Sequence, residues 1–230
     1  MLETINKVIT KLSLLVLISA SLLTLTGAAA PGGGRFAPPP RPALFFEEHW
    51  QQIPGGGENP ISQAHVANPD LELVLYGPKH DELQITGIAG SDSNPIHTWS
   101  GLCGAGCVFA FKHQDYYADL TGAARIMVQS KTSGFHKIRP FIKLADGTAL
   151  VGNVEIGNTA DFLFTEFRIS DVRWLTFNTD LGVTRGNFVD LDLSRVDEIG
   201  FVDLQPGADH GPGGWSDVAV IRVYANQVER

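Results

Sequence analysis

The richest source of chemistry in this sequence is a glycine-rich stretch near its end, Pro206–Trp215, with the sequence PGADHGPGGW. An imidazole next to a carboxylate is the arrangement of a general base, and an indole ring offers a flat apolar surface. Loops held by a rigid scaffold often carry function. Asp209 and His210 are therefore candidate catalytic residues, and Trp215 is a candidate binding residue. The alternative is a surface loop whose tryptophan plugs one end of the fold.

A second candidate is a basic and polar strand face. Residues 123–145 alternate apolar and polar side chains around Ser133-Gly134, which predicts a β-hairpin that turns at this pair. Its polar face contains long side chains that are able to donate hydrogen bonds to hydroxyls and planar carboxylates. They are Arg125, Gln129, Lys131, Arg139 and Lys143. The alternative is a solvated face paired with Glu166 or Asp161. His136 follows the turn and is a further candidate base, although such a position is more typical of a surface histidine.

A third group lies in Ser91–Ser100, which contains Asp92, Asn94, His97 and Trp99. Trp99 is a second candidate binding residue because its ring is a possible stacking surface. With His113 and Asp115 the group supplies atoms that are able to bind a metal, but the spacing matches no metal-ligand motif. The sequence contains no nucleophile elbow, phosphate loop or H-E-x-x-H motif. Glycoside cleavage needs two carboxylates a few ångströms apart, which Glu155, Asp161, Glu166, Asp203 and Asp209 supply only if the fold brings a pair together.

The two cysteines, Cys103 and Cys107, lie four residues apart with glycines between them. We expect a disulfide that closes a short loop. Free thiols are the second interpretation, and a metal or redox pair is the third. A structural zinc site needs about four ligands, and the sequence has no second cysteine pair to supply them.

Short runs rich in Val, Ile, Phe and Trp follow residue 43 and are separated by Gly, Pro, Asn and Asp, without a convincing amphipathic helix. This spacing predicts an all-β, antiparallel β-sandwich of the jelly-roll type. The expected strands are 44–50, 71–76, 83–89, 107–113, 123–131, 136–145, 148–155, 161–169, 172–178, 197–204 and 217–225.

The first residues resemble a secretory leader. Lys7 and Lys11 precede an apolar run, Leu12–Leu25, that is too short to span a membrane, and small residues follow it. We expect a cleaved signal peptide over 1–28, a Gly/Pro-rich spacer over 29–42, and one β-sandwich domain over 43–230, exported to the periplasm or the cell exterior without stable membrane insertion. The formal net charge of −8 excludes a general nucleic-acid-binding role.

Four segments carry a family resemblance: Tyr117–Ile126, Phe167–Trp174, Leu193–Phe201 and Val220–Tyr224. Their strand entries resemble those of galactose-binding-like β-sandwiches, a group that includes several carbohydrate-binding modules and the complex I intermediate-associated protein family. The resemblance spans about residues 115–225. It implies a jelly-roll sandwich, often with a glycan ligand and often with a structural Ca²⁺, for which Asp70, Glu72 and Asp217 are the candidates; no other cofactor is expected.

These observations favour a non-catalytic protein that binds a glycan or another polar small molecule. The first alternative is a secreted glycoside-cleaving hydrolase or lyase, akin to the keto-disaccharide hydrolase-like domains, with His210 or His136 as base and Arg139 or Lys143 holding an oxyanion. The second is an envelope assembly protein that binds a protein partner through a sheet edge. The sequence leaves the oligomeric state and the role of residues 43–114 open.

Overall fold

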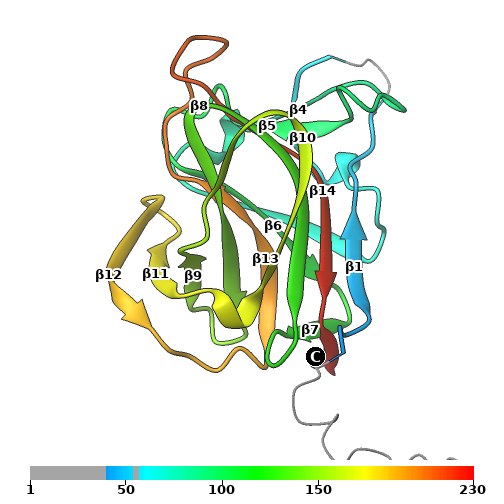
Figure 1. Cartoon of the computed structure of the whole chain (residues 1–230), viewed down its shortest axis with the longest axis vertical. Helices are drawn as coiled ribbons and strands as arrows, with labels where there is room; N and C mark the ends of the chain where they lie inside the picture. The colour runs from blue at the N-terminus through cyan, green and yellow to red at the C-terminus, as the bar shows by residue number, and fades with distance from the viewer. Residues whose placement is uncertain (1–39, 54–56) are drawn as a thin grey trace, which may run out of the picture. The chain divides into compact units, whose positions relative to one another are not determined.

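One long strand, β8 (Arg125–Leu144), organises the fold. Its first half pairs with β10 on one side and β14 on the other, and its second half pairs with β13 and β9. The strand therefore passes from one sheet layer into the other, and Figure 1 shows it between the two groups of strands. The computed structural model describes residues 40–53 and 57–230, so the predicted signal peptide and most of the predicted spacer lie outside the described residues.

The first layer contains the beginning of β8 and the strands paired around it. In order across the sheet its strands are β10 (Ile156–Arg168), β8, β14 (Ser216–Tyr224) and β1 (Leu44–Glu48). At one end of β14 the sheet continues through β5 (His97–Trp99), β4 (Gln84–Thr86) and β2 (Asn59–Pro60).

The second layer contains the end of β8. Its strands are β3 (Leu71–Tyr76), β6 (Cys107–His113), β13 (Val196–Asp203), β8, β9 (Ala149–Gly152), β11 (Trp174–Asn178) and β12 (Val183–Val189). β7 (Tyr116–Asp119) pairs with β13 and with β15 (Asn226–Glu229). The short 3-10 helices are η2 (Gln63–His65), η3 (His80–Glu82) and η4 (Ile169–Asp171).

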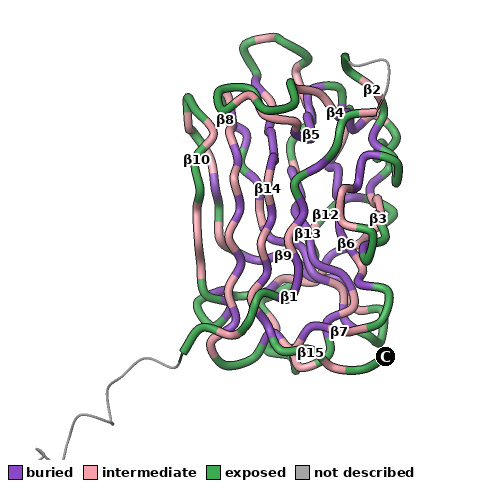
Figure 2. The backbone as a smooth tube through the Cα atoms, turned by 90° about the vertical axis from the view of Figure 1, so that its right-hand side faces the viewer, coloured by how far each residue is buried: buried purple, intermediate pink, exposed green. Residues whose placement is uncertain are grey.

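The main hydrophobic core lies between the layers. Ile126 and Val128 of β8 are fully buried, as are Phe201 and Ile221 on the strands that flank its two halves. Each such side chain contributes about 1.5–3 kcal/mol through burial. Figure 2 shows buried stretches concentrated along the strands and exposed stretches in the connections. A smaller cluster around Phe141 and Phe177 lies apart from this core.

The predicted antiparallel β-sandwich is confirmed, because every pair among the named strands is antiparallel. The predicted hairpin at 123–145 is wrong. Ser133-Gly134 is a bend within β8, and the two halves of the strand pair with different partners. Gly134 has a φ of +62°, and a Cβ there would lie 2.2 Å from the carbonyl oxygen of Gly213, so only glycine fits.

The prediction also missed β12. This strand, with the sequence VTRGNFV, is mostly exposed, and among the described strands it pairs only with β11, so it lacks the alternation that marks a strand with one buried face. No helix in the part of the chain that the structure describes is long and apolar enough to cross a membrane.

Candidate ligand-binding site

A pocket of about 210 Å³ lies at the end of the first layer where β5, β8 and β14 meet the 205–215 loop. Lys131, Asp217 and Trp99 are cross-strand neighbours there, since Asp217 is paired with Lys131 on one side and with Trp99 on the other. Residues from five strands and three connections line the pocket: Glu58, Thr86, Asn94, His97, Trp99, Lys131, Phe162, His210, Trp215 and Asp217.

The walls of the pocket are aromatic. The imidazole of His210 stacks on the indole of Trp99, with ring centroids 4.7 Å apart and planes inclined by 17°. The same imidazole meets Trp215 edge-on at 6.0 Å. On the β10 side, Phe162 contacts the His97 ring at 5.0 Å, and the Lys131 ammonium lies 5.9 Å from the centre of the Phe162 ring. These rings give the pocket flat apolar surfaces.

Two buried titratable side chains face each other inside the pocket. Asp217 is 3% exposed and His97 is 5% exposed, and 3.6 Å separates Asp217 Oδ1 from His97 Nε2. Burial raises the pKa of Asp217 to about 7 and lowers the pKa of His97 to about 4. Both shifts have the same physical cause, because each group loses the water that would solvate its charged form.

The hydrogen bonds around this pair determine which atoms remain available. The Trp215 Nε1–H donates to Asp217 Oδ2 at 3.3 Å. The His97 Nδ1–H donates to the carbonyl oxygen of Pro95 at 2.7 Å, so the neutral ring carries its proton on Nδ1 and Nε2 is an acceptor. Asp217 Oδ1 is buried and has no hydrogen-bond partner among the described residues, 40–53 and 57–230.

The loop that carries His210 is held by the backbone around the disulfide. Cys103 and Cys107 are bonded, as predicted. The N–H of Gly207 donates to the carbonyl of Cys103 at 2.7 Å, and the N–H of Asp209 donates to the carbonyl of Gly101 at 2.8 Å. A Cβ on Gly207 would lie 2.2 Å from the Gly101 oxygen, so this close approach requires glycine.

A second buried acid–histidine pair lies in the same end of the sandwich. His136 Nδ1 and Asp203 Oδ2 are 2.6 Å apart, and the same oxygen accepts bonds from the hydroxyls of Ser100 and Ser216 at 3.0 and 2.7 Å. Asp203 Oδ1 accepts the backbone N–H of Gln205. His136 is 1% exposed and does not line the pocket. The structure therefore places this candidate base in a buried network, apart from His210 and Trp215.

The structure divides the five polar residues predicted to share one face. Lys131 lines the pocket. Arg125 also belongs to the first half of β8, where its Nη1 donates to Glu166 Oε1 at 2.9 Å, as the alternative interpretation expected; Gln129 lies between these two residues on the same half. Arg139 and Lys143 belong to the second half of β8 and hence to the other layer. The correction follows from β8 being one strand that changes layers.

The two residues on the second layer have partners of their own. Arg139 forms an ion pair with Glu155. The Lys143 ammonium donates to the Tyr76 hydroxyl oxygen at 2.7 Å and lies 3.2 Å from Glu198 Oε1. Neither lines the pocket, so the structure does not bring either residue together with His210.

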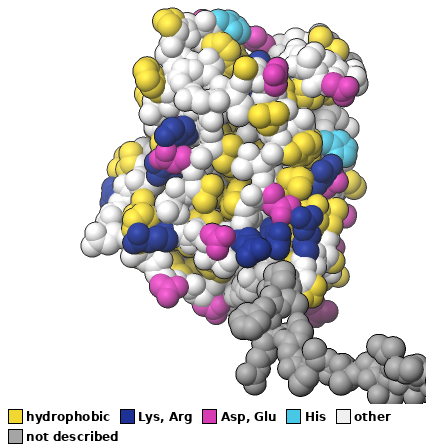
Figure 3. All heavy atoms as spheres, in the orientation of Figure 1, with side chains coloured by type: hydrophobic (Ala, Val, Ile, Leu, Met, Phe, Trp, Pro, Cys, Tyr) yellow, Lys and Arg dark blue, Asp and Glu magenta, His cyan; other side chains and the backbone are white. Residues whose placement is uncertain are grey.

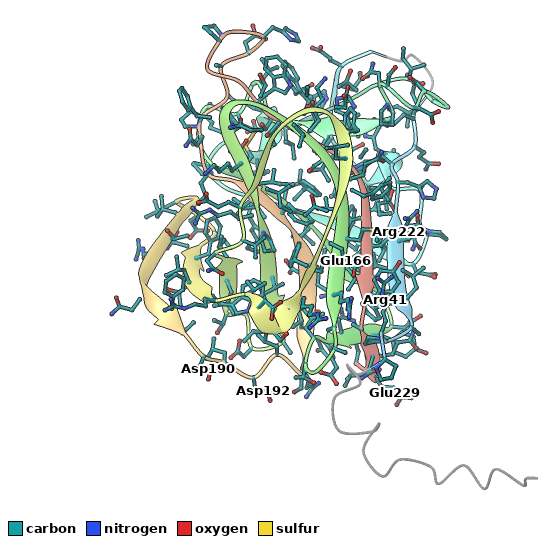
Figure 4. All side chains as sticks on the ribbon, viewed as in Figure 1. Arg41, Glu166, Asp190, Asp192, Arg222 and Glu229 are labelled. Carbon is teal, nitrogen blue, oxygen red and sulfur yellow. A yellow bond between two sulfur atoms is a disulfide. The ribbon has the colours of Figure 1, made fainter. Side chains whose placement is uncertain are left out.

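Several charged side chains on the outer surface form ion pairs with side chains of opposite charge. In Figure 4, Arg41, Glu166 and Arg222 lie along the β10, β14 and β1 side of the first layer. Arg41 and Arg125 both pair with Glu166, and Arg222 pairs with Glu47. Figure 3 shows basic and acidic side chains intermixed on the face in view, with no broad patch of one sign.

The three candidate calcium ligands do not lie together in one site. Asp70 and Glu72 lie at the start of β3, whereas Asp217 lies in the pocket on β14. Within residues 40–53 and 57–230, no group of three or more His, Cys, Asp or Glu side chains is placed to hold a metal ion.

The sequence marks most of the residues that line the pocket, but it does not indicate that they lie together in one site. The sequence pattern places Trp99, Trp215, His210 and Lys131 in three different groups and marks Asp217 only as a candidate calcium ligand. Phe162 was not singled out. The available signal was the alternation along 97–99 and 215–217, which directs His97, Trp99, Trp215 and Asp217 to one face if the two segments pair.

Comparisons with protein-family models and with curated proteins give no match. Solved structures similar to this chain include the family 11 carbohydrate-binding module of the cellulase Lic26A-Cel5E of Clostridium thermocellum, with a TM-score of 0.43 and 13% identity over 74% of this chain and 96% of that one. The same module in complex with a β-1,3-1,4-mixed-linked tetrasaccharide gives a TM-score of 0.38 and 15% identity over 79% and 98%.

An exo-β-agarase gives a TM-score of 0.40 and 11% identity over 71% of this chain. This chain spans about a quarter of the length of that enzyme, with 24% of it covered. Carbohydrate-binding modules are thus among the structures similar to this chain, as the sequence resemblance led us to expect.

Proposed function

We propose that this chain is an exported protein that binds carbohydrate, without cleaving it, in the pocket at the end of the first layer. The observation that carries the proposal is the combination of aromatic walls, formed by Trp215, Phe162 and the His210 ring that stacks on buried Trp99, with separate polar groups. Sites for small ligands commonly have apolar walls and a few fixed polar groups. A sugar ring has the matching chemistry, with C–H faces that pack on aromatic rings and hydroxyls around its edge.

The size of the pocket limits what it accepts. Its volume of about 210 Å³ is below the ~300–1,000 Å³ of sites that enclose drug-sized ligands. We therefore expect it to hold a single sugar unit, with the remainder of an oligosaccharide outside. Glu58, Asn94 and His210 are exposed at the rim and have donors and acceptors for hydroxyls of such a neighbouring unit.

Two features support export. The Cys103–Cys107 disulfide is typical of proteins that fold in an oxidising compartment. The sequence of residues 1–28 has the layout of a signal peptide. Mass spectrometry of the protein recovered from the cell exterior or periplasm would test this part of the proposal, with cleavage near Ala28 as the expected result.

Affinity gel electrophoresis at pH 5.5 tests carbohydrate binding directly. The panel comprises mixed-linkage β-1,3-1,4-glucan, agarose and arabinan, and we expect at least one to retard the protein. Trp215→Ala should weaken this binding about tenfold or more, because an aromatic contact contributes about 1 kcal/mol beyond the area it buries. Phe188→Ala is the matched control, since it removes an exposed aromatic ring on β12, outside the pocket. Absence of retardation by every polysaccharide, or equal retardation of Trp215→Ala, would contradict the proposal.

One observation favours glycoside cleavage as a second candidate function. Asp217 is a buried carboxyl in an aromatic pocket, and its pKa is raised to about 7, which is the state of a general acid. Release of reducing ends from the same polysaccharides distinguishes the two functions. The binding proposal predicts none, whereas turnover that disappears in Asp217→Asn would replace it with an enzyme.

A further inference from the structure

The buried pair formed by Asp217 and His97 has a feature that packing alone does not explain. Asp217 Oδ1 is without a hydrogen-bond partner, and it faces His97 Nε2 at 3.6 Å inside the pocket. A buried polar atom left unpaired costs roughly 1–3 kcal/mol, so a structural pair would be expected to close this gap. The Asp203–His136 pair does close it, at 2.6 Å.

We infer that a protonated Asp217 and a neutral His97 bind a single hydroxyl group of a neutral sugar, which accepts a hydrogen bond from Asp217 Oδ1–H and donates one to His97 Nε2. This inference rests on the proposed function and names the part of the ligand that the pocket recognises. A hydroxyl is the suitable group because it is both a donor and an acceptor.

The surrounding bonds fix the direction of both hydrogen bonds. Trp215 Nε1–H needs an acceptor, so Asp217 Oδ2 is the carbonyl oxygen and the proton of the acid lies on Oδ1. Pro95 accepts the His97 Nδ1–H, so Nε2 presents a lone pair. Because 3.6 Å is shorter than two hydrogen bonds placed end to end, one hydroxyl oxygen placed beside the pair is within bonding distance of both atoms. Asp217 Oδ1 is itself closed to solvent, so the hydroxyl enters with a small movement of the side chains.

The charges around the pair are consistent with a protonated Asp217 in weakly acidic solution. Lys131 faces it from β8 and lowers its pKa, but loss of solvation is the larger effect, and the pKa is about 7. His97 faces it from β5 and is neutral above pH of about 4. The other titratable groups that line the pocket are Glu58 and His210, both exposed; Phe162 of β10 and Thr86 of β4 carry no charge.

Ionisation of Asp217 should disrupt this recognition. Above pH 7 both Asp217 Oδ1 and His97 Nε2 are acceptors, and one hydroxyl hydrogen cannot satisfy both. If only the protonated acid binds, affinity should fall about thirtyfold between pH 5.5 and pH 8.5, given a pKa of about 7.

Asp217→Asn provides the decisive variant. Trp215 Nε1–H should hold the amide oxygen at the position of Oδ2, which directs the amide N–H₂ toward the pocket as a permanent donor. We expect the affinity of this variant for the polysaccharide that binds in the gel assay to stay constant, within twofold, from pH 5.5 to pH 8.5. Asp171→Asn, which neutralises an exposed carboxylate on η4, should retain the thirtyfold loss.

NMR titration tests the pair without depending on that assay. In protein labelled with ¹³C at aspartate and ¹⁵N at histidine, we expect the Asp217 carboxyl to titrate near pH 7, His97 to carry its proton on Nδ1, and D-glucose to raise the Asp217 midpoint. An Asp217 carboxyl already ionised at pH 5.5, or unaltered pH dependence of binding in Asp217→Asn, would overturn the inference while leaving binding through Trp215 intact. Failure of every polysaccharide to bind, with Asp217 still titrating near pH 7 and unaffected by glucose, would overturn the proposed function and this inference together.

Discussion

The two buried acid–histidine pairs of this sandwich have the same residue types and different surroundings. Asp203 accepts hydrogen bonds from His136, Ser100, Ser216 and the backbone of Gln205, so both its oxygens are occupied. Asp217 accepts one bond, from Trp215, and its other oxygen lies in a pocket. The comparison teaches that burial of such a pair does not by itself indicate function. An unsatisfied buried atom on a side chain that lines a pocket is the informative feature.

The largest expected effect concerns the satisfied pair. Asp203→Ala should lower the free energy of unfolding by about 3–5 kcal/mol, because it leaves several buried donors without their acceptor. Asp217→Ala removes a single hydrogen bond and should cost only about 1–2 kcal/mol. Urea denaturation at pH 4, where the raised pKa of Asp217 leaves the stabilisation from its proton almost complete, measures both. Equal losses in the two variants would show that the pairs do not differ in the way that their hydrogen bonds indicate.

The next effect concerns pH. Between pH 3.8 and about 7, Asp217 is protonated in the folded protein and ionised in the unfolded chain. The stabilisation from this group is therefore complete below pH 3.8 and is lost as pH rises through 7. Asp217→Asn lacks this loss. Relative to the wild type, its free energy of unfolding should therefore increase by about 4 kcal/mol between pH 4 and pH 8.

His97 contributes with the opposite sign in both proteins. Its folded-state pKa of about 4 lies below the usual 6.5, so its contribution is complete above pH 6.5 and is lost as pH falls through 4. In the wild type the two groups change the free energy of unfolding in opposite directions as pH changes. In Asp217→Asn only the contribution of His97 remains. Denaturation curves at pH 4, 5.5, 7 and 8 would reveal this; a difference between variant and wild type that is constant with pH would contradict the assignment.

The smallest expected effect comes from removing the disulfide, which should alter the surroundings of Asp217 and His97 but not those of Asp203 and His136. Replacing Cys103 and Cys107 by serine should reduce the free energy of unfolding by about 2 kcal/mol, since the bond closes a very short loop. Because the backbone at Gly101 and Cys103 holds Gly207 and Asp209, we expect a further loss of carbohydrate affinity in the gel assay. The His136 ring signals should change little, as β8 and β13 hold that pair. Unchanged affinity would show that the loop is positioned without the disulfide.

The sequence allowed correct prediction of the fold class and of many strands, because period-two alternation and glycine-rich turns follow from local geometry. It failed at Ser133-Gly134, where the same dipeptide suits a hairpin turn or a bend in one strand. Only the partners available in three dimensions decide between them, and here β14 and β13 pair with the two halves. That error placed Arg139 and Lys143 on the face of Lys131.

The candidate site was only partly predictable for a related reason. Local composition marked Trp99, His210 and Trp215 because each lies in or beside a polar or glycine-rich stretch. Nothing local marked Phe162 on β10, or the neighbourhood of Asp217 and His97, which lie 120 residues apart in sequence and on adjacent strands.

The sequence by itself determined the residue types, the alternation that gives an antiparallel sandwich and the cysteine spacing that closes a short loop. Only the tertiary structure decided which acid is satisfied and which is not, because the hydrogen bonds of Asp203 and Asp217 come from strands and loops far apart in the chain. The solvation and hydrogen bonding of a buried carboxyl depend on all its neighbours in space, and the packing of β5, β8, β10, β13 and β14 selects those neighbours.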